Sequence, residues 1–210
     1  MRQRLAVLLT LGAFLCVLCG FAQGQGGSTG ESVSHAQVGD DRDEEPAGES
    51  QDGTRNPGAT QIKAAFLSKF GDFVEWPPAA FAGAGEPFVI GVLGAAALVA
   101  ELERVAAGRT VQGRPITVRR LEKEDKLEGL HVLFIGEDQR ERLPKVLGEA
   151  AGRALLTVTE VPEPLAAGSM INFVSEAGRV RFDIALPPAE RSRLRISARL
   201  LAVARKVVKS

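Results

Sequence analysis

The folded part of this chain is predicted to be an α/β domain, with a mostly parallel sheet of about six strands flanked by helices. Two observations predict this class. Between residues 87 and 159, apolar runs that suit buried strands alternate with helical patterns. After residue 169, two strand-like runs are separated by a short Glu-Ala-Gly turn, so they should pair as an antiparallel hairpin at the edge of the sheet. Residues 61–210 have the usual size of one domain with one core.

The domain is expected to open with an aromatic helix over 62–78. Its apolar residues fall at steps of four, four and three, which places them on one side of a helix: Ile62, Phe66, Phe70 and Phe73. Trp76, the only tryptophan, closes the run, and Pro77 and Pro78 prevent a further turn. We interpret this helix as a core element rather than a ligand site, since a packing role explains each apolar position.

The remaining elements are expected in the following order. Strands should cover 87–94, 115–121, 131–135, 154–159, 169–175 and 179–186. Helices should cover 95–107, a segment from Leu143 to 152, and a long C-terminal stretch from 187 to about 208, re-capped at Ser197. Residues 122–128 read as a charged connector. Apolar and polar residues alternate over 179–186, which suits an edge strand with one polar face.

The first 22 residues have the pattern of a cleavable secretory signal. Arg2 and Arg4 precede an apolar run over 5–18, and small residues place the cut after Ala22. A lipoprotein anchor at Cys16 or Cys19 is the rival interpretation, but bulky leucines directly before both cysteines argue against it. We therefore expect a periplasmic protein whose mature form has neither a thiol nor a disulfide.

Residues 23–60 are predicted to be a disordered acidic linker. They are rich in Gly, Ser, Asp, Glu and Gln, contain no aromatic residue and carry a net charge of −6, against +4 for residues 61–210. Such a segment is most simply a solubilising spacer. The mildly basic domain lacks an aromatic platform, so we expect no nucleic-acid binding.

The domain lacks the residues that most enzymes and metal sites need. It contains one histidine, His131, no tyrosine and, after cleavage, no cysteine, and no serine lies in a G-x-S-x-G motif. His131 is interpreted as a residue at a strand end. We therefore predict a protein that is not an enzyme and that uses neither a cofactor nor a metal.

Two groups of residues remain as candidate binding sites. Arg191, Arg195 and Arg199 recur every fourth residue and would form a basic stripe on a helix, available to an acidic partner or to lipid headgroups. Gly91 and Gly94 frame a strand-to-helix junction whose backbone amides could hold an anion or a small ligand, although no phosphate-binding motif is present. A solvated helix face and a tight turn are the corresponding structural interpretations.

Several pieces of the domain, in this order, resemble the YfiR-like family of exported bacterial proteins. They are IKAAFLSKFGDFVEWP, PFVIGVLG, HVLFIG, LLTVTE, SMINFV, RVRFDIAL and RISARLLAVARKV, which together span about residues 61–208. The sharpest are the helix ending in Glu75-Trp76-Pro77 and the strand with Met170-Ile171-Asn172-Phe173. On this resemblance the signature residues, expected to be structural, are Phe70, Trp76, Pro77, Met170, Asn172 and Phe173.

The resemblance implies a periplasmic α/β domain that forms a homodimer. In the type protein of the family, this domain restrains a membrane-bound diguanylate cyclase through the cyclase's periplasmic part, and an outer-membrane lipoprotein relieves the restraint. This chain departs from the family pattern at Gly168-Ser169, Ile184-Ala185 and Ser197-Ala198, and Leu130 stands where a cysteine is common. The type protein's disulfides are therefore not expected here.

The sequence thus leads to one function hypothesis and one alternative. The first is a non-enzymatic periplasmic regulator that binds and restrains an inner-membrane signalling protein, such as a diguanylate cyclase. The alternative is a periplasmic small-ligand-binding or receptor-accessory protein, for which the junction at Gly91 and Gly94 would be the site.

Overall fold

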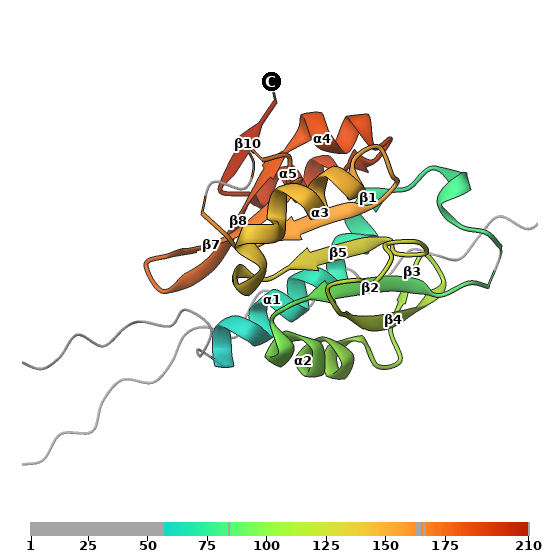
Figure 1. The fold of residues 1–210 in the computed structure, drawn as a ribbon, viewed down its shortest axis with the longest axis horizontal. Helices are drawn as coiled ribbons and strands as arrows, with labels where there is room; N and C mark the ends of the chain where they lie inside the picture. Colours follow the sequence, from blue (N-terminus) through green and yellow to red (C-terminus); the bar gives the residue numbers. More distant parts are fainter. Residues whose placement is uncertain (1–56, 84, 163–164, 166, 210) are drawn as a thin grey trace, which may run out of the picture. The chain divides into compact units, whose positions relative to one another are not determined.

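The computed structural model describes residues 57–83, 85–162, 165 and 167–209 (Figure 1). The strands are β1 (Val74–Glu75), β2 (Phe88–Leu93), β3 (Thr110–Val111), β4 (Arg114–Leu121), β5 (Val132–Ile135), β6 (Leu156–Thr159), β7 (Ile171–Glu176), β8 (Arg179–Ala185), β9 (Arg195–Ile196) and β10 (Lys206–Val208). The α-helices are α1 (Pro57–Phe70), α2 (Ala96–Ala106), α3 (Leu143–Ala150), α4 (Leu186–Arg191) and α5 (Ala198–Val203). Short 3-10 helices are η1 (Gly71–Phe73), η2 (Pro78–Ala80) and η3 (Glu137–Arg142). The predicted signal peptide and most of the predicted linker lie outside the described residues.

Eight strands form the main sheet, in the order β10-β8-β7-β6-β5-β2-β4-β3. Neighbours run parallel except in the β7–β8 and β3–β4 pairs. The predicted α/β class with a mostly parallel sheet is confirmed, as is the hairpin, in which Ile171 pairs with Ile184. The predicted count of about six strands is wrong, and so is the edge position of the hairpin, because β10 pairs with β8 on its outer side.

The opening helix is displaced from its predicted position. α1 begins at Pro57, within the segment assigned to the linker, and ends at Phe70. Its buried face includes Ala64, Leu67 and Phe70, whereas Ile62 is 45% exposed. An α-helix turns by about 100° per residue, so each step of four drifts by about 40° and places Ile62 to the side of Phe70. The regular helix also stops eight residues before Pro78, because η1 and β1 follow it.

The central α/β units match the predicted pattern more closely. β2, α2, β4 and β5 follow in the expected order. Pro144 lies in the first turn of α3, which begins at Leu143 as predicted. Proline is tolerated there because its missing N–H would have had no partner inside the helix. The short strand β3 was not predicted.

The C-terminal segment does not form the predicted helix over 187–208. It contains α4, β9, α5 and β10 in succession. The chain turns after α4, where Arg193 has a φ of 58°, a left-handed conformation that interrupts an α-helix. Ser197 does cap a helix, as predicted: its side chain accepts the Leu200 N–H at the start of α5. β9 pairs with β1, and β10 extends the main sheet.

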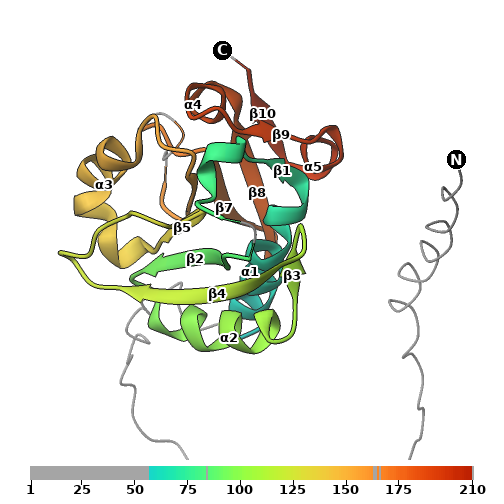
Figure 2. The ribbon, with the colours of Figure 1, turned by 90° about the vertical axis from the view of Figure 1, so that its right-hand side faces the viewer.

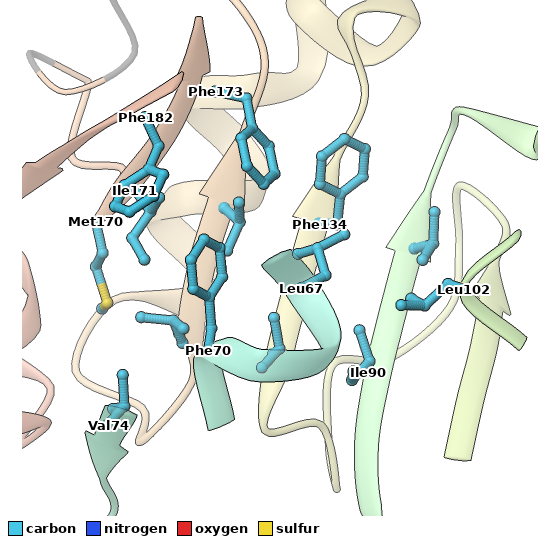
Figure 3. Packing of buried hydrophobic residues seen from close by; sticks show 14 of the residues in the cluster. Leu67, Phe70, Val74, Ile90, Leu102, Phe134, Met170, Ile171, Phe173 and Phe182 are labelled. Carbon is cyan, nitrogen blue, oxygen red and sulfur yellow. The ribbon is translucent and has the colours of Figure 1, made fainter. Parts of the chain in front are cut away.

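Two apolar cores lie on opposite faces of the sheet. Alternate residues of β5 separate them, since Val132 and Phe134 belong to the core under α1 and α2, and Leu133 and Ile135 to the core under α3. Figure 2 shows α3 across the sheet from α1 and α2. The larger core has an aromatic centre in which Phe70 lies 5.9 Å from Phe173, centroid to centroid (Figure 3).

Candidate functional site

The three arginines of the predicted basic stripe come from three different elements. Arg191 ends α4, Arg195 lies in β9 and Arg199 lies in α5, so they do not share one helix face. All three are exposed, and none forms an ion pair with another residue in the described part of the chain. Their role as a partner-binding surface stays a prediction. The three side chains are carried by consecutive short elements of a segment that changes direction, and they do not form a stripe along one helix.

The surrounding segment concentrates the positive charge of the domain. From residue 190 onward, one acidic residue stands against seven basic ones: Arg191, Arg193, Arg195, Arg199, Arg205, Lys206 and Lys209. Both ribbon views place α4, α5 and β10 together, beside the C-terminus (Figures 1 and 2). We call residues 190–209 the basic C-terminal segment. An excess of one charge at one end of a domain favours encounter with an acidic surface.

Gly91 has a packing role within β2. A Cβ on Gly91 would come within 2.8 Å of the Leu130 Cδ1 and 3.0 Å of the Leu121 Cδ1, so a larger residue would require these leucine side chains to shift. Gly91 therefore lies in the sheet interior rather than at a ligand-facing turn.

Gly94 lies where the sheet order reverses, because β2 has β4 on one side and β5 on the other. This is the place where open α/β sheets usually bind ligands. Gly94 has a φ of 76°, and a Cβ there would overlap the carboxylate of Asp138. A cavity of about 140 Å³ lies beside it, lined in part by Arg120, Lys123 and Asp138. An anionic ligand would meet a resident carboxylate in a cavity smaller than the roughly 300 Å³ typical of ligand pockets, so the geometry gives the predicted anion turn little support.

The six signature residues pack in or beside the core, with Pro77 the least buried of them. Trp76 packs edge-on against Phe88 at 5.1 Å. Asn172 is buried at the β6–β7 boundary, where the Thr159 hydroxyl donates to its Oδ1 at 3.0 Å and the neighbouring Ser169 hydroxyl donates to the Ile171 carbonyl at 2.9 Å. Buried polar groups of this kind stabilise a fold only when they are hydrogen-bonded, as these are.

A comparison with models of protein families identifies the family of this chain. The model of the YfiR/HmsC-like family matches residues 60–205, which is most of the chain. This chain belongs to the YfiR/HmsC-like family. The family is regulatory and non-catalytic, and its theme is periplasmic control of cyclic di-GMP signalling. A comparison with curated proteins found no match.

Two charged contacts of this YfiR/HmsC-like domain were missed at the level of sequence. The Arg205 guanidinium donates to both Asp183 carboxylate oxygens, at 2.8 and 2.6 Å, and Glu176 lies 3.5 Å away. The hydrogen bonds to Asp183 raise the pKa of Arg205. Lys63 of α1 donates to Glu160, which follows β6, at 2.5 Å. The first pair could not be found because Arg205 was assigned to a helix, and the second joins residues 97 positions apart.

Within the described ranges, no three His, Cys, Asp or Glu side chains gather where they could hold a metal ion. None of the helices between residues 57 and 209 has the length and apolar character needed to cross a bilayer.

Proposed function

We propose that this YfiR/HmsC-like protein is a non-enzymatic periplasmic regulator that restrains a diguanylate cyclase of the inner membrane. It would do so by binding the part of the cyclase that faces the periplasm. The observation that carries the proposal is the family match over residues 60–205, which covers nearly the whole described domain. The predicted signal peptide supplies the compartment.

The basic C-terminal segment is the surface that we assign to the partner. Its exposed arginines at 191, 195 and 199 are free of intramolecular ion pairs with described residues, so binding need not break an ion pair among those residues. Free guanidinium groups can form bidentate hydrogen bonds with carboxylates of an acidic partner. In contrast, Arg205 of the same segment is occupied by Asp183 and holds β10 in place.

Deletion of the gene tests the regulatory function. The proposal predicts that cyclic di-GMP rises in the deletion strain and returns to its original level when the full-length chain is supplied. A version without residues 1–22 should stay in the cytoplasm and fail to complement. Unchanged cyclic di-GMP in the deletion strain under several growth conditions would contradict the cyclase assignment.

The oligomeric state and a second partner belong to the same proposal. We propose a homodimer whose restraint of the cyclase is relieved by an outer-membrane lipoprotein. Light scattering of the purified mature chain should give twice the monomer mass. Co-purification with outer-membrane proteins should recover the lipoprotein. A monomer at micromolar concentration would contradict the dimer.

The alternative of a small-ligand-binding or receptor-accessory protein has less support. The turn at Gly94 is occupied by Asp138, and a cavity of about 290 Å³ beside α3 is lined mainly by small residues. A thermal-shift screen with nucleotides and amino acids distinguishes the two functions. A ligand that binds only the native state raises the melting temperature in proportion to the logarithm of its concentration, so such a shift would favour the alternative.

A further inference from the structure

The domain's one histidine lies in an aromatic stack at the amino-terminal end of β5. His131 is 3% exposed, and its backbone bridges two strands, donating to the Val89 carbonyl and accepting from the Leu156 N–H, both at 2.9 Å. Its ring lies between Phe81, at 4.6 Å, and Phe88, at 5.0 Å, nearly parallel to both. A fully buried titratable ring is therefore built into the packing of the domain.

The outer end of this aromatic stack is covered by the positive charge of Arg114. The Arg114 guanidinium lies over the other face of Phe81, 4.1 Å from the ring centroid. Arg114 also donates to the Gly83 carbonyl at 2.7 Å and to the Glu86 carbonyl at 3.0 Å. We call residues 77–83 the covering segment. Phe81 attaches this segment to the sheet, because its ring lies between the His131 ring and the Arg114 guanidinium.

The hydrogen bonds of the ring require its neutral form. His131 Nδ1 accepts the Val89 N–H at 3.1 Å, so Nδ1 cannot carry a proton while this bond exists. Nε2 is buried and makes no hydrogen bond with the described residues, although the Ala80 backbone lies close enough to affect the ring. A second proton would therefore break the Val89 contact and leave a charged ring out of reach of water.

The charges around the ring also oppose protonation. Burial lowers the pKa of His131, and the Arg114 guanidinium lowers it further, whereas the Ala80 backbone and the Glu86 carboxylate act in the opposite direction. Glu128, Arg153 and Arg193 line the neighbouring cavity together with Ala80 and Leu130. A phenyl face attracts a cation, but Phe81 already has Arg114 on its outer face.

We propose that His131 is an acid-sensitive latch whose protonation releases the covering segment from the sheet. Protonation removes the Nδ1 acceptor and places a second positive charge on the inner side of Phe81, opposite Arg114. The charged ring can reach water if Phe81 moves away, which also separates the Phe81 ring from the Arg114 guanidinium. A protein exported to the periplasm experiences the pH of the medium, so the device would respond to external acid. It does not depend on the identity of the partner.

Trp76 provides a direct reporter of this movement. It immediately precedes the covering segment, packs on Phe88, which itself stacks on His131, and is the chain's only tryptophan. The emission of the mature chain should shift to longer wavelength as the pH falls from 7.5 to 4.5. The NMR signal of the His131 ring should titrate with the same midpoint, below the ordinary histidine value of about 6.5.

Variants at the latch separate this proposal from general acid denaturation. H131N cannot titrate, yet its side-chain oxygen can still accept the Val89 N–H, so its Trp76 emission should stay constant over the range in which the unaltered chain shifts. H131F keeps an aromatic ring in the stack and should behave in the same way. R114M removes the opposing charge and should move the transition to higher pH. The proposal is overturned if His131 titrates without a change in Trp76 emission, or if H131N shows the same shift at the same pH.

Discussion

The two ends of the described domain are held in different ways. The first, from α1 to Phe88, is fixed by aromatic contacts: Phe70 and Trp76 are buried, and Trp76 packs on Phe88. The last, the basic C-terminal segment, is fixed by short strand pairings and by the Arg205–Asp183 ion pair. Its exposed arginines at 191, 195 and 199 form no ion pair with the described residues. We infer that the first region supplies stability, and we propose that the second binds the partner. Substitutions in the first region should therefore change stability, and substitutions of the exposed arginines in the second should change binding.

The largest loss of stability is expected from Phe70→Ala. Phe70 is 1% exposed and contacts three other phenylalanine rings, Phe66, Phe173 and Phe182. Removing the ring leaves a cavity that the sheet cannot fill, so we expect a loss of about 4 kcal/mol in urea unfolding. Ile62→Ala on the same helix is the control and should change stability by about 0.5 kcal/mol or less, because Ile62 is half exposed. Equal effects would show that the packing assigned to α1 is wrong.

Trp76→Ala should lower the free energy of unfolding by about 3 kcal/mol, since the indole is largely buried. Trp76→Phe is the matched control. The indole Nε1 makes no hydrogen bond with the described residues, so phenylalanine loses only contact area and should cost clearly less. Calorimetric melting of both variants measures the difference. Normal melting of Trp76→Ala would contradict a packing role.

Arg205→Met should destabilise the domain by less than either aromatic truncation. The substitution leaves the buried Asp183 carboxylate without its bidentate partner and frees β10 from β8. Arg199→Met is the control, because Arg199 is exposed and forms no ion pair with described residues. Hydrogen exchange along β8 measures the release of β10. Unchanged protection there would mean that strand pairing alone holds the C-terminal segment.

His131, which stacks on Phe88 of the aromatic region, should make the free energy of unfolding depend on pH. Its folded pKa is lowered, mainly by burial. Below the ordinary histidine value of about 6.5, the unfolded chain therefore binds a proton that the folded chain refuses. The free energy of unfolding should be unaffected by His131 above about pH 6.5 and should fall as the pH drops below it. Urea unfolding of the unaltered chain and of H131N gives this contribution by difference, and parallel curves would contradict it.

The comparison also shows what could be read from the sequence. The sequence predicted the longer buried strands, such as β2 and β5, and it predicted α3 with a proline in its first turn. In these elements the pattern of apolar residues along the chain agrees with their burial in the fold. The C-terminal segment was mispredicted because β9 and β10 have two and three residues, too few for a period to appear. β9 pairs with β1, far away in the chain, and β10 pairs with β8, from which α4, β9 and α5 separate it.

In the candidate site too, the sequence identified the residues but not their arrangement in space. The three arginines were identified as charged residues, but their arrangement on α4, β9 and α5 depends on the turn at Arg193. His131 was correctly placed at a strand end, but its sandwich between Phe81 and Phe88 joins residues up to 50 positions apart. Side-chain spacing along the chain carries no signal for such contacts.

The most direct test of the account is a binding measurement with charge-reversed variants. The purified mature chain is titrated against the periplasmic part of the cyclase, with Arg191, Arg195 and Arg199 all replaced by Glu in one variant. A control variant carries Glu at Lys69, Arg140 and Lys145, which are equally exposed and lie on α1, η3 and α3. We predict that the first variant melts normally but binds at least about tenfold more weakly, a loss of about 1.4 kcal/mol, whereas the control binds as the unaltered chain does. Equal affinity of both variants would show that the basic C-terminal segment is not the partner-binding surface.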